Sequence, residues 1–541
     1  MMNRHPAESE RRALHQKTPE TCCAKALDTM SSTNHFELAS RDPDGLAVDD
    51  FTRTRTWSQL LERCIRTARF LRDEQGLSPD DHVAILMGNR VEVVELILGG
   101  IMAGIWVTPI NWHLSEDEIA YVVKDSGAKV IFTDDHYLEI AQSIEMESPE
   151  SSRIVVAGDE LDRLLAATSN EPLDLAGPAG GNMIYTSGTT GRPKGVKRTR
   201  QPNLEAAMNF LGEYGVRVGL DGSGPHLITG PMYHAAPLMF AVYDNANGAP
   251  LVIMPRWDDE QALELIMERE IAHLHMVPTM FVRLLRLSEK TKAKFSAPKL
   301  KLVLHGAAPV SVEVKQEMIA WMGEKLVEYW GATEGGVNTL IDSAQWLAHP
   351  GSVGTTLPDF EVFAVDPEGN RLPHGETGDL YCRHKRLDRV FEYHGDPEKT
   401  EGAYLEKGVF TIGDIGWVEA NGHVFLADRK SNMIISGGVN IYPREIEQVL
   451  ALHPAISDVG VFGIPDDEWG ESVKAAVELR KGFTASADLE SEILDFARER
   501  LARYKVPRTI DFEDTLPRES TGKLYIRRLR DRYWKGRGRR I

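Results

Sequence analysis

The sequence predicts an α/β protein with a large N-terminal domain of parallel-rich sheets flanked by helices and a smaller α+β C-terminal domain. Its 541 residues exceed what one hydrophobic core accommodates, so at least two domains are expected. Over most of the chain, short apolar runs alternate with stretches of helical period, which is typical of parallel sheets covered by helices. After about Leu380 the pattern changes to a hairpin-like stretch and a compact final unit.

The expected elements of the large domain follow one another along the chain. The most apolar stretch, Leu96–Ile110, is shorter than the ~20 residues that a bilayer span needs, so we expect a buried helix running into a strand. Ser115 and Glu118 have the spacing of a capping box at the start of a helix. The expected strands are 81–89, 128–135, 181–185, 225–230, 249–255, 274–278, 301–306 and 325–331. Further helices are expected at 259–270 and 311–323. The final unit is expected to be a small α+β unit built from the segments 458–466, 471–480, 489–504 and 508–517.

Composition limits the class of protein. Hydrophobic residues make up 42% of the chain and charged residues 26%, which is normal for a soluble globular protein. The net charge of −19 argues against nucleic-acid binding, which needs a basic surface. The first 30 residues lack the apolar segment of a secretory signal, so we expect a cytoplasmic protein without a membrane span. Residues 1 to about 35 are polar and lack periodicity, so we expect a disordered leader. The cysteines, expected to be reduced thiols without metal-ligand spacing, are Cys22, Cys23, Cys64 and Cys382.

A glycine- and hydroxyl-rich loop follows the expected strand 181–185. The stretch YTSGTTGRPKGVKRTR (Tyr185–Arg200) combines glycines that permit close backbone approach, hydroxyls that donate hydrogen bonds, and cations that suit phosphate oxygens. It lies where ligands bind in such sheets, beyond the carboxyl end of a strand, and predicts a loop that wraps a polyphosphate. A Walker A loop is disfavoured, because Pro193 stands before Lys194 and Gly195 follows it.

Five motifs in order carry a family resemblance. YTSGTTGRPKGV closely resembles the phosphate loop of the adenylate-forming superfamily, which includes acyl-CoA synthetases, aryl-CoA ligases, adenylation domains and luciferases. EYWGATEGG, FTIGD, DRKSNMIISGGVNIYPREIE and LPRESTGKLYIRRLRD resemble its later motifs, and the resemblance runs from about residue 35 to about residue 532. It implies a large ATP- and acyl-binding domain at 36–429 and a small, mobile catalytic-lysine domain at 430–541.

The resemblance implies a two-step reaction that uses ATP, Mg²⁺ and coenzyme A. A carboxylate attacks the α-phosphorus of ATP, giving an acyl-adenylate and pyrophosphate, and a thiol then displaces AMP. Glu334 is implied as the metal ligand, Trp330 as the ring that stacks on adenine, and Asp414 as the acceptor of the ribose hydroxyls. The predicted catalytic residues are Lys523, Thr333, Glu334 and His234. The predicted ATP-binding residues are Thr186, Ser187, Gly188, Thr189, Thr190, Gly191, Lys194, Trp330, Gly331, Thr333, Asp414, Arg429 and Lys523.

The substrate sites follow from the same resemblance. The stretches around His234, 275–279 and 305–309 offer no carboxylate to pair an ammonium group, so an apolar acid is expected: fatty, aromatic, or a ring-bearing propanoate. Relatives often carry Asp or Lys at the hinge where this chain has Ser431. The predicted acyl-pocket residues are His234, Ala235, Leu238, Val277, Gly306, Ala307 and Ala308. The predicted hinge and coenzyme A tunnel residues are Ser431, Gly437, Gly438 and Asn440.

Several alternatives remain open at this stage. The favoured function is an acyl- or aryl-CoA synthetase, and the first alternative is a ligase that passes the acyl group to an amine or to a carrier-protein thiol. A luciferase-like monooxygenase and a non-catalytic scaffold are less favoured, since Glu334, Asp414, Arg429 and Lys523 are all present. The sequence also leaves a homodimer open.

Overall fold

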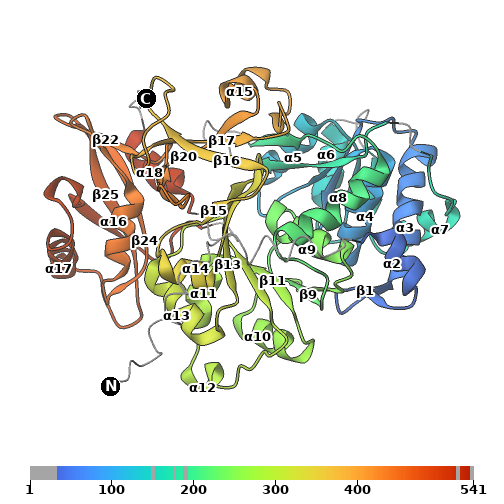
Figure 1. Ribbon diagram of the computed structural model, residues 1–541, viewed down its shortest axis with the longest axis horizontal. Helices are drawn as coiled ribbons and strands as arrows, with labels where there is room; N and C mark the ends of the chain where they lie inside the picture. Colours follow the sequence, from blue (N-terminus) through green and yellow to red (C-terminus); the bar gives the residue numbers. More distant parts are fainter. Residues whose placement is uncertain (1–32, 148–152, 175–176, 187–192, 519–523, 536–541) are drawn as a thin grey trace, which may run out of the picture.

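Four β-sheets organise the protein. A computed structural model describes residues 33–147, 153–174, 177–186, 193–518 and 524–535. The described strands form one nine-stranded sheet, one seven-stranded sheet and two five-stranded sheets. In Figure 1 the N-terminal part of the chain (blue) and the C-terminal unit (red) lie at opposite ends of the long axis. The mixed α/β architecture with a separate C-terminal unit confirms the predicted fold class.

The nine-stranded sheet has the order β15-β14-β13-β12-β11-β9-β10-β1-β2. Its six central strands are parallel, whereas β2 at one edge and β14 and β15 at the other are antiparallel. The predicted strands at 225–230, 249–255, 274–278, 301–306 and 325–331 are all confirmed here. The members are β1 (Leu46–Asp49), β2 (Thr54–Thr56), β9 (His226–Ile228), β10 (Leu251–Ile253), β11 (His273–Met276), β12 (Leu302–His305), β13 (Leu326–Ala332), β14 (Gly336–Asp342) and β15 (Thr355–Thr356).

The seven-stranded sheet has the order β18-β8-β7-β4-β3-β5-β6. Strands β7, β4, β3, β5 and β6 are parallel, and β8 returns antiparallel to β7. The predicted phosphate loop follows β7 and precedes β8 in the sequence, and its residues 187–192 lie outside the described residues. The members are β3 (His82–Leu86), β4 (Trp106–Pro109), β5 (Ala128–Thr133), β6 (Arg153–Val156), β7 (Gly181–Thr186), β8 (Lys194–Arg198) and β18 (Phe391–Tyr393).

Helices cover the faces of these two sheets. The predicted capping box is present, because the Ser115 hydroxyl accepts from the Glu118 backbone and the Glu118 side chain accepts from the Ser115 backbone. The helices are α2 (His35–Arg41), α3 (Trp57–Arg69), continued by the π-helix η1 (Phe70–Glu74), α4 (Val91–Ala103), α5 (Glu116–Ser126), α6 (Leu138–Glu147), α7 (Asp159–Ala167), α8 (Leu204–Arg217), α9 (Ala235–Ala246), α10 (Asp259–Glu268), α11 (Pro278–Leu285), α12 (Glu289–Lys292), α13 (Val312–Met322), α14 (Ser343–Ala348) and α15 (Pro397–Gly402).

The first described helix corrects the predicted end of the leader. Asn34 caps α2, since its side chain accepts hydrogen bonds from the backbone N–H groups of Phe36 and Glu37. The His35 ring is buried and its Nε2 lies 2.9 Å from Oδ1 of Asn245. Asn34 and His35, assigned to the leader 1–35 from their polar neighbourhood, are therefore part of the fold, because tertiary contacts order them.

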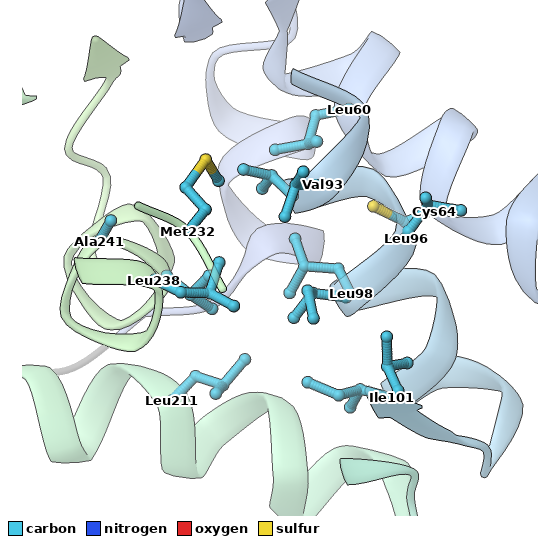
Figure 2. Packing of buried hydrophobic residues seen from close by; sticks show 14 of the residues in the cluster. Leu60, Cys64, Val93, Leu96, Leu98, Ile101, Leu211, Met232, Leu238 and Ala241 are labelled. Carbon is cyan, nitrogen blue, oxygen red and sulfur yellow. The ribbon is translucent and has the colours of Figure 1, made fainter. Parts of the chain in front are cut away.

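The core of the large domain lies between α3 and α4 on one side and α8 and α9 on the other (Figure 2). Helix α4 is buried along its whole length and runs into β4, as predicted for this apolar stretch. It also buries two carboxylates, which are both paired: Glu92 contacts Arg90 at 2.8 Å, and Glu95 contacts Arg55 at 2.6 Å and Arg63 at 2.8 Å. These ion pairs are what allow a charged helix to be enclosed in an apolar core.

Two smaller sheets complete the fold. The antiparallel sheet β16-β17-β20-β19, with β21 on β20, stands beside the large sheets, and the last sheet, β23-β22-β25-β24 with β26 parallel to β25, belongs to the C-terminal unit. The first comprises β16 (Phe360–Val365), β17 (Gly378–His384), β19 (Tyr404–Glu406), β20 (Val409–Val418) and β21 (Val424–Arg429). The second comprises β22 (Ile434–Ser436), β23 (Val439–Ile441), β24 (Ile456–Asp466), β25 (Gly470–Leu479) and β26 (Thr509–Glu513), with α16 (Pro443–Ala451), α17 (Ala487–Arg498), η2 (Arg503–Lys505) and α18 (Ile526–Trp534).

The predicted domain boundary at 429/430 falls between β21 and β22, which belong to different sheets. Contacts still cross it: the backbone N–H of Arg444 in α16 donates to Oδ2 of Asp428 at 2.8 Å. Across the ranges given above, no helix has the length and apolar character needed to cross a membrane.

Candidate active site

One cavity of about 1350 Å³ gathers many of the predicted site residues. Its walls come from β7 and β8 of the seven-stranded sheet, β11, β13 and β14 of the nine-stranded sheet, and helices α8, α9 and α18. The predicted residues that line it are Thr186, His234, Ala235, Val277, Ala307, Gly331, Thr333, Glu334, Arg429 and Ser431. Nucleotide-motif residues and acyl-pocket residues therefore share one space.

Other predicted residues lie away from the walls of this cavity or outside the described chain. Lys194 forms an ion pair with Asp396, with 2.9 Å between Nζ and Oδ2. Ser187, Gly188, Thr189, Thr190, Gly191 and Lys523 lie outside the described residues. Trp330, Asp414, Leu238, Gly306, Ala308, Gly437, Gly438 and Asn440 are described but do not line the cavity.

Asp414 joins two of the predicted nucleotide residues. The indole Nε1–H of Trp330 donates to its Oδ2 at 2.7 Å, and Nε of Arg429 lies 2.7 Å from its Oδ1. The pairing of Asp414 opposite Arg429 in the β20–β21 ladder brings the ion pair together. The residue is only 6% exposed, and its two partners hold the carboxylate in one orientation.

Trp330 has a different position from the predicted one. The residues on either side of it, Tyr329 and Gly331, line the cavity, whereas the indole is 5% exposed and packs with Phe391 and Phe410. Side chains alternate between the two faces of a strand, so β13 turns Trp330 away from the cavity. In this arrangement Trp330 contacts the predicted nucleotide residues through its hydrogen bond to Asp414, and its ring does not line the cavity.

Glu334 lies in the cavity with a tyrosine bound to it. The hydroxyl of Tyr393 in β18 donates to its Oε1 at 3.1 Å, and Lys399 lines the same region. Burial lowers the pKa of Lys399, and the nearby Glu334 carboxylate opposes that shift. No described cluster of three or more His, Cys, Asp or Glu residues could enclose a metal ion. A single carboxylate in an open cavity suits Mg²⁺, which keeps water and takes its remaining ligands from phosphates.

Sequence reasoning missed Tyr393 and Lys399, which line the cavity, and Asp396, which is the ion-pair partner of Lys194. All three lie in the stretch FEYHGDPEKT, which resembles none of the motifs used above. The Lys194 ammonium donates to Asp396 and holds the pKa of this carboxyl below its usual range. No sequence signal pointed to these residues, since the antiparallel pairing of β18 with β8 brings them to the site from almost 200 positions further along the chain.

The acyl side of the cavity has aromatic walls. His234 precedes α9, with its ring 4.3 Å from that of Tyr233. Phe240, His275 and Tyr329 form a second group, in which Nε2 of His275 lies 3.2 Å from the Tyr329 hydroxyl. Burial lowers the pKa of His275 to about 3, so this ring is neutral at physiological pH. The wall is therefore apolar and uncharged at this point.

Three predicted acyl-pocket residues, Leu238, Gly306 and Ala308, do not line the cavity. Leu238 faces the core, where it packs toward Leu98 of α4 (Figure 2). Its neighbours Pro237 and Met239 line the cavity, because a helix turns successive side chains by about 100°. Gly306 packs against Tyr329, where a Cβ would lie 2.7 Å from the backbone oxygen. Ala308 is also absent from the cavity wall, so of the three residues Gly306, Ala307 and Ala308 only Ala307 lines the cavity.

The predicted coenzyme A tunnel residues lie in an exposed hairpin, β22–β23. Gly437 and Gly438 have φ values of 57° and 81°, a backbone conformation that favours glycine. Gly438 has open space where a side chain would extend, and Gly437 packs on the ring of Trp469. The C-terminal unit instead presents Leu524–Arg527 and Arg530 to the cavity. In this conformation the chain next to position 523, and not the hairpin, borders the site.

Comparison with known proteins defines the class. Residues 36–389 match the AMP-binding enzyme family, and residues 445–523 match the AMP-binding enzyme C-terminal domain. The chain therefore belongs to the AMP-binding enzyme family, which confirms the predicted resemblance to the adenylate-forming superfamily and supports an AMP-forming acid–thiol ligase.

Individual relatives cover nearly the whole chain. A fatty acid–acyl-carrier-protein ligase of Streptomyces coeruleorubidus is 31% identical over 95% of this chain and 98% of its own length. A long-chain-fatty-acid–CoA ligase of Mycobacterium tuberculosis is 32% identical over 85% of this chain and 89% of its own length. The crystal structure of ATP-bound MatB from Rhodopseudomonas palustris matches with a TM-score of 0.80 and 27% identity over 92% of this chain and 99% of that one.

Proposed function

We propose that this protein activates an apolar carboxylic acid with ATP and transfers the acyl group to the thiol of coenzyme A. The observation that carries the proposal is the cavity that Thr333, Glu334 and Arg429 line together with aromatic residues of the acyl side. In the first step a carboxylate oxygen bonds to the α-phosphorus and pyrophosphate leaves. In the second step a thiol sulfur bonds to the acyl carbon and AMP leaves.

Each nucleotide residue has a distinct part in this proposal. Asp414, oriented by Trp330 and Arg429, accepts the ribose hydroxyls, and Thr333 donates to the α-phosphate. Mg²⁺, when bound, neutralises phosphate charge, and Glu334 is the carboxylate that would hold it. Tyr393 keeps that carboxylate in place through its hydrogen bond.

The phosphate loop and the lysine lie outside the described residues, and their roles are proposed from the motifs. Ser187, Gly188, Thr189, Thr190 and Gly191 would hold the β- and γ-phosphates. Lys523 would bridge the attacking carboxylate and the α-phosphate, where a positioned cation stabilises the charge that develops.

The lining chemistry supports an apolar acid. Among the described residues of the cavity wall, the carboxylates are Glu118 and Glu334. Glu118 is engaged in the capping box of α5, and Glu334 is assigned to the metal. An amino-acid substrate would bury its ammonium group against Phe240, His275 and Tyr329 without a counter-ion, which is costly.

A carrier-protein thiol is the second candidate acceptor. The observation that favours it is the near-complete match to the fatty acid–acyl-carrier-protein ligase, which covers 95% of this chain. Coenzyme A and a carrier protein present the same phosphopantetheine thiol, so the first step is common to both.

The test mixes the protein with ATP, Mg²⁺ and a panel of fatty, aromatic and ring-bearing acids, with coenzyme A, with a phosphopantetheinylated carrier protein, or with neither. Release of pyrophosphate and AMP is expected with at least one apolar acid, and the thioester product identifies the acceptor. Stoichiometric ADP in place of AMP would refute adenylate chemistry.

A further inference from the structure

Two polar residues occupy neighbouring positions on paired strands in the wall of the otherwise aromatic acyl side. In the β7–β8 ladder Met183 pairs with Lys197 and Ile184 pairs with Val196, so the same antiparallel register sets Asn182 opposite Arg198. Residues two apart on a strand share a face, which puts this pair on the face of Ile184 and Val196. All four of these residues line the cavity, whereas Lys197 does not.

The Arg198 guanidinium lies among the tyrosines of this wall. It stands 6.0 Å from the centre of the Tyr214 ring, and it lies near the Tyr243 side chain. Both terminal nitrogens lie 3.0 Å from the point where a Cβ of Gly336 would be. Gly336 thus leaves room for the guanidinium to lie flat against the backbone at the start of β14.

Arg198 has no carboxylate partner among the described residues, in contrast to several other cations around the cavity. Arg200 pairs with Asp80, Arg429 with Asp414, and Lys430 with Asp379. No Asp or Glu oxygen in the described chain comes within 4.0 Å of the Arg198 side chain. A partly buried cation without a counter-charge is unfavourable unless another group satisfies it.

The opposing amide is also poorly satisfied. Nδ2 of Asn182 contacts the sulfur of Met239 at 2.7 Å, and thioether sulfur is a weak acceptor. Its Oδ1 is buried and has no hydrogen-bond partner in the described part of the protein. Buried amides normally use their donors and acceptors, so this one has capacity for a further partner.

We propose that Arg198, assisted by Asn182, binds an oxygen atom carried by the far part of the acid substrate. The substrate class is then an apolar acid with a second oxygen function, a ketone carbonyl or a second carboxylate, remote from the carboxyl group that is activated. Thr186, where the predicted phosphate loop begins, and Asn182 are four residues apart on β7, which is about 13 Å along an extended strand. The oxygen is therefore well separated from the reacting end. This inference depends on the proposed function, since it assigns the specificity of the same pocket.

The test compares three acids of matched chain length: a plain alkanoic acid, the same chain with a remote ketone, and the α,ω-dicarboxylic acid. Several chain lengths are used with ATP and Mg²⁺, and kcat/KM is measured from pyrophosphate release. Charge-assisted hydrogen bonds contribute enough for wild type to prefer at least one oxygen-bearing acid by about tenfold or more. The better of the two oxygen-bearing acids tells whether Arg198 selects a charged or a neutral oxygen.

Arg198→Leu should abolish this preference by lowering kcat/KM for the oxygen-bearing acid while leaving the plain acid within about threefold. Lys197→Leu is the matched control, because it removes a cation from the opposite face of the same strand, and its preference should remain that of wild type. If the Arg198→Leu variant fails to fold, Arg198→Lys takes its place in the test. This variant keeps the positive charge, so it should lose only part of the preference for the oxygen-bearing acid.

Equal use of all three acids by wild type, or an equal fall for all three acids in the Arg198 variant, would overturn the inference and leave the proposed function standing. Pyrophosphate release with none of the acids would overturn the proposed function itself.

Discussion

Replacing Asp414 by asparagine tests the centre of the nucleotide site. The carboxylate accepts from Trp330 at one oxygen and contacts Arg429 at the other, each at 2.7 Å. An amide has one oxygen and one NH₂ group, so in either orientation it sets a donor against one of these two donors. The variant therefore loses its fixed orientation as well as its charge.

The magnitude follows from the bonds that are lost. Two charge-assisted hydrogen bonds to the ribose hydroxyls contribute ~1.5–3 kcal/mol each, so their loss corresponds to a fall of about 10²–10⁴ in kcat/KM for ATP. The unpaired donor should lower the free energy of unfolding by ~1–3 kcal/mol. Arg429 adds little to that cost, because its side chain is 43% exposed and water can solvate it.

The assay is acid-dependent exchange of labelled pyrophosphate into ATP, with a thermal denaturation curve to establish that the variant is folded. Trp330→Phe is the matched control, because it removes the indole N–H and leaves the carboxylate. We expect this variant to lower kcat/KM for ATP by about tenfold. An unchanged KM for ATP in a folded Asp414→Asn variant would refute the assignment of the FTIGD motif to the ribose.

Four further predictions concern other parts of the protein. Tyr393→Phe should raise the Mg²⁺ concentration needed for half-maximal AMP formation several-fold, since Glu334 loses its hydrogen bond; an unchanged Mg²⁺ titration would contradict the metal assignment. Lys523→Ala should lower adenylation about 10²–10³-fold, whereas a supplied acyl-adenylate and coenzyme A should still give thioester, and near-normal adenylation would exclude the catalytic role. Gly438→Trp should spare adenylation and block thioester formation in separate half-reaction assays; equal loss of both would argue against the tunnel. Leu238→Ala should lower the free energy of unfolding by ~2–5 kcal/mol in urea denaturation with little change of acid preference, and a changed preference would return the side chain to the pocket.

The sequence by itself determined the features that depend on contiguous residues. Strand and helix patterns predicted the parallel cores of the two large sheets, the capping box of α5 and the buried α4–β4 segment. The ordered motifs led to the family and to Thr333 and Glu334 in one cavity wall, because neighbours on a chain stay together whatever the rest of the fold does.

Only the tertiary structure decided which distant side chains meet. Asp414 reaches Trp330 across 84 positions and Tyr393 reaches Glu334 across 59, because different sheets pack against one another in a way that no local pattern specifies. The same is true of orientation: Trp330 and Leu238 occupy positions suggested by motifs, yet the alternation of β13 and the packing of α9 turn both away from the cavity. The pairing of Asn182 with Arg198 likewise depends on the β7–β8 register, since a shift of one residue would move each side chain to the other face of the sheet.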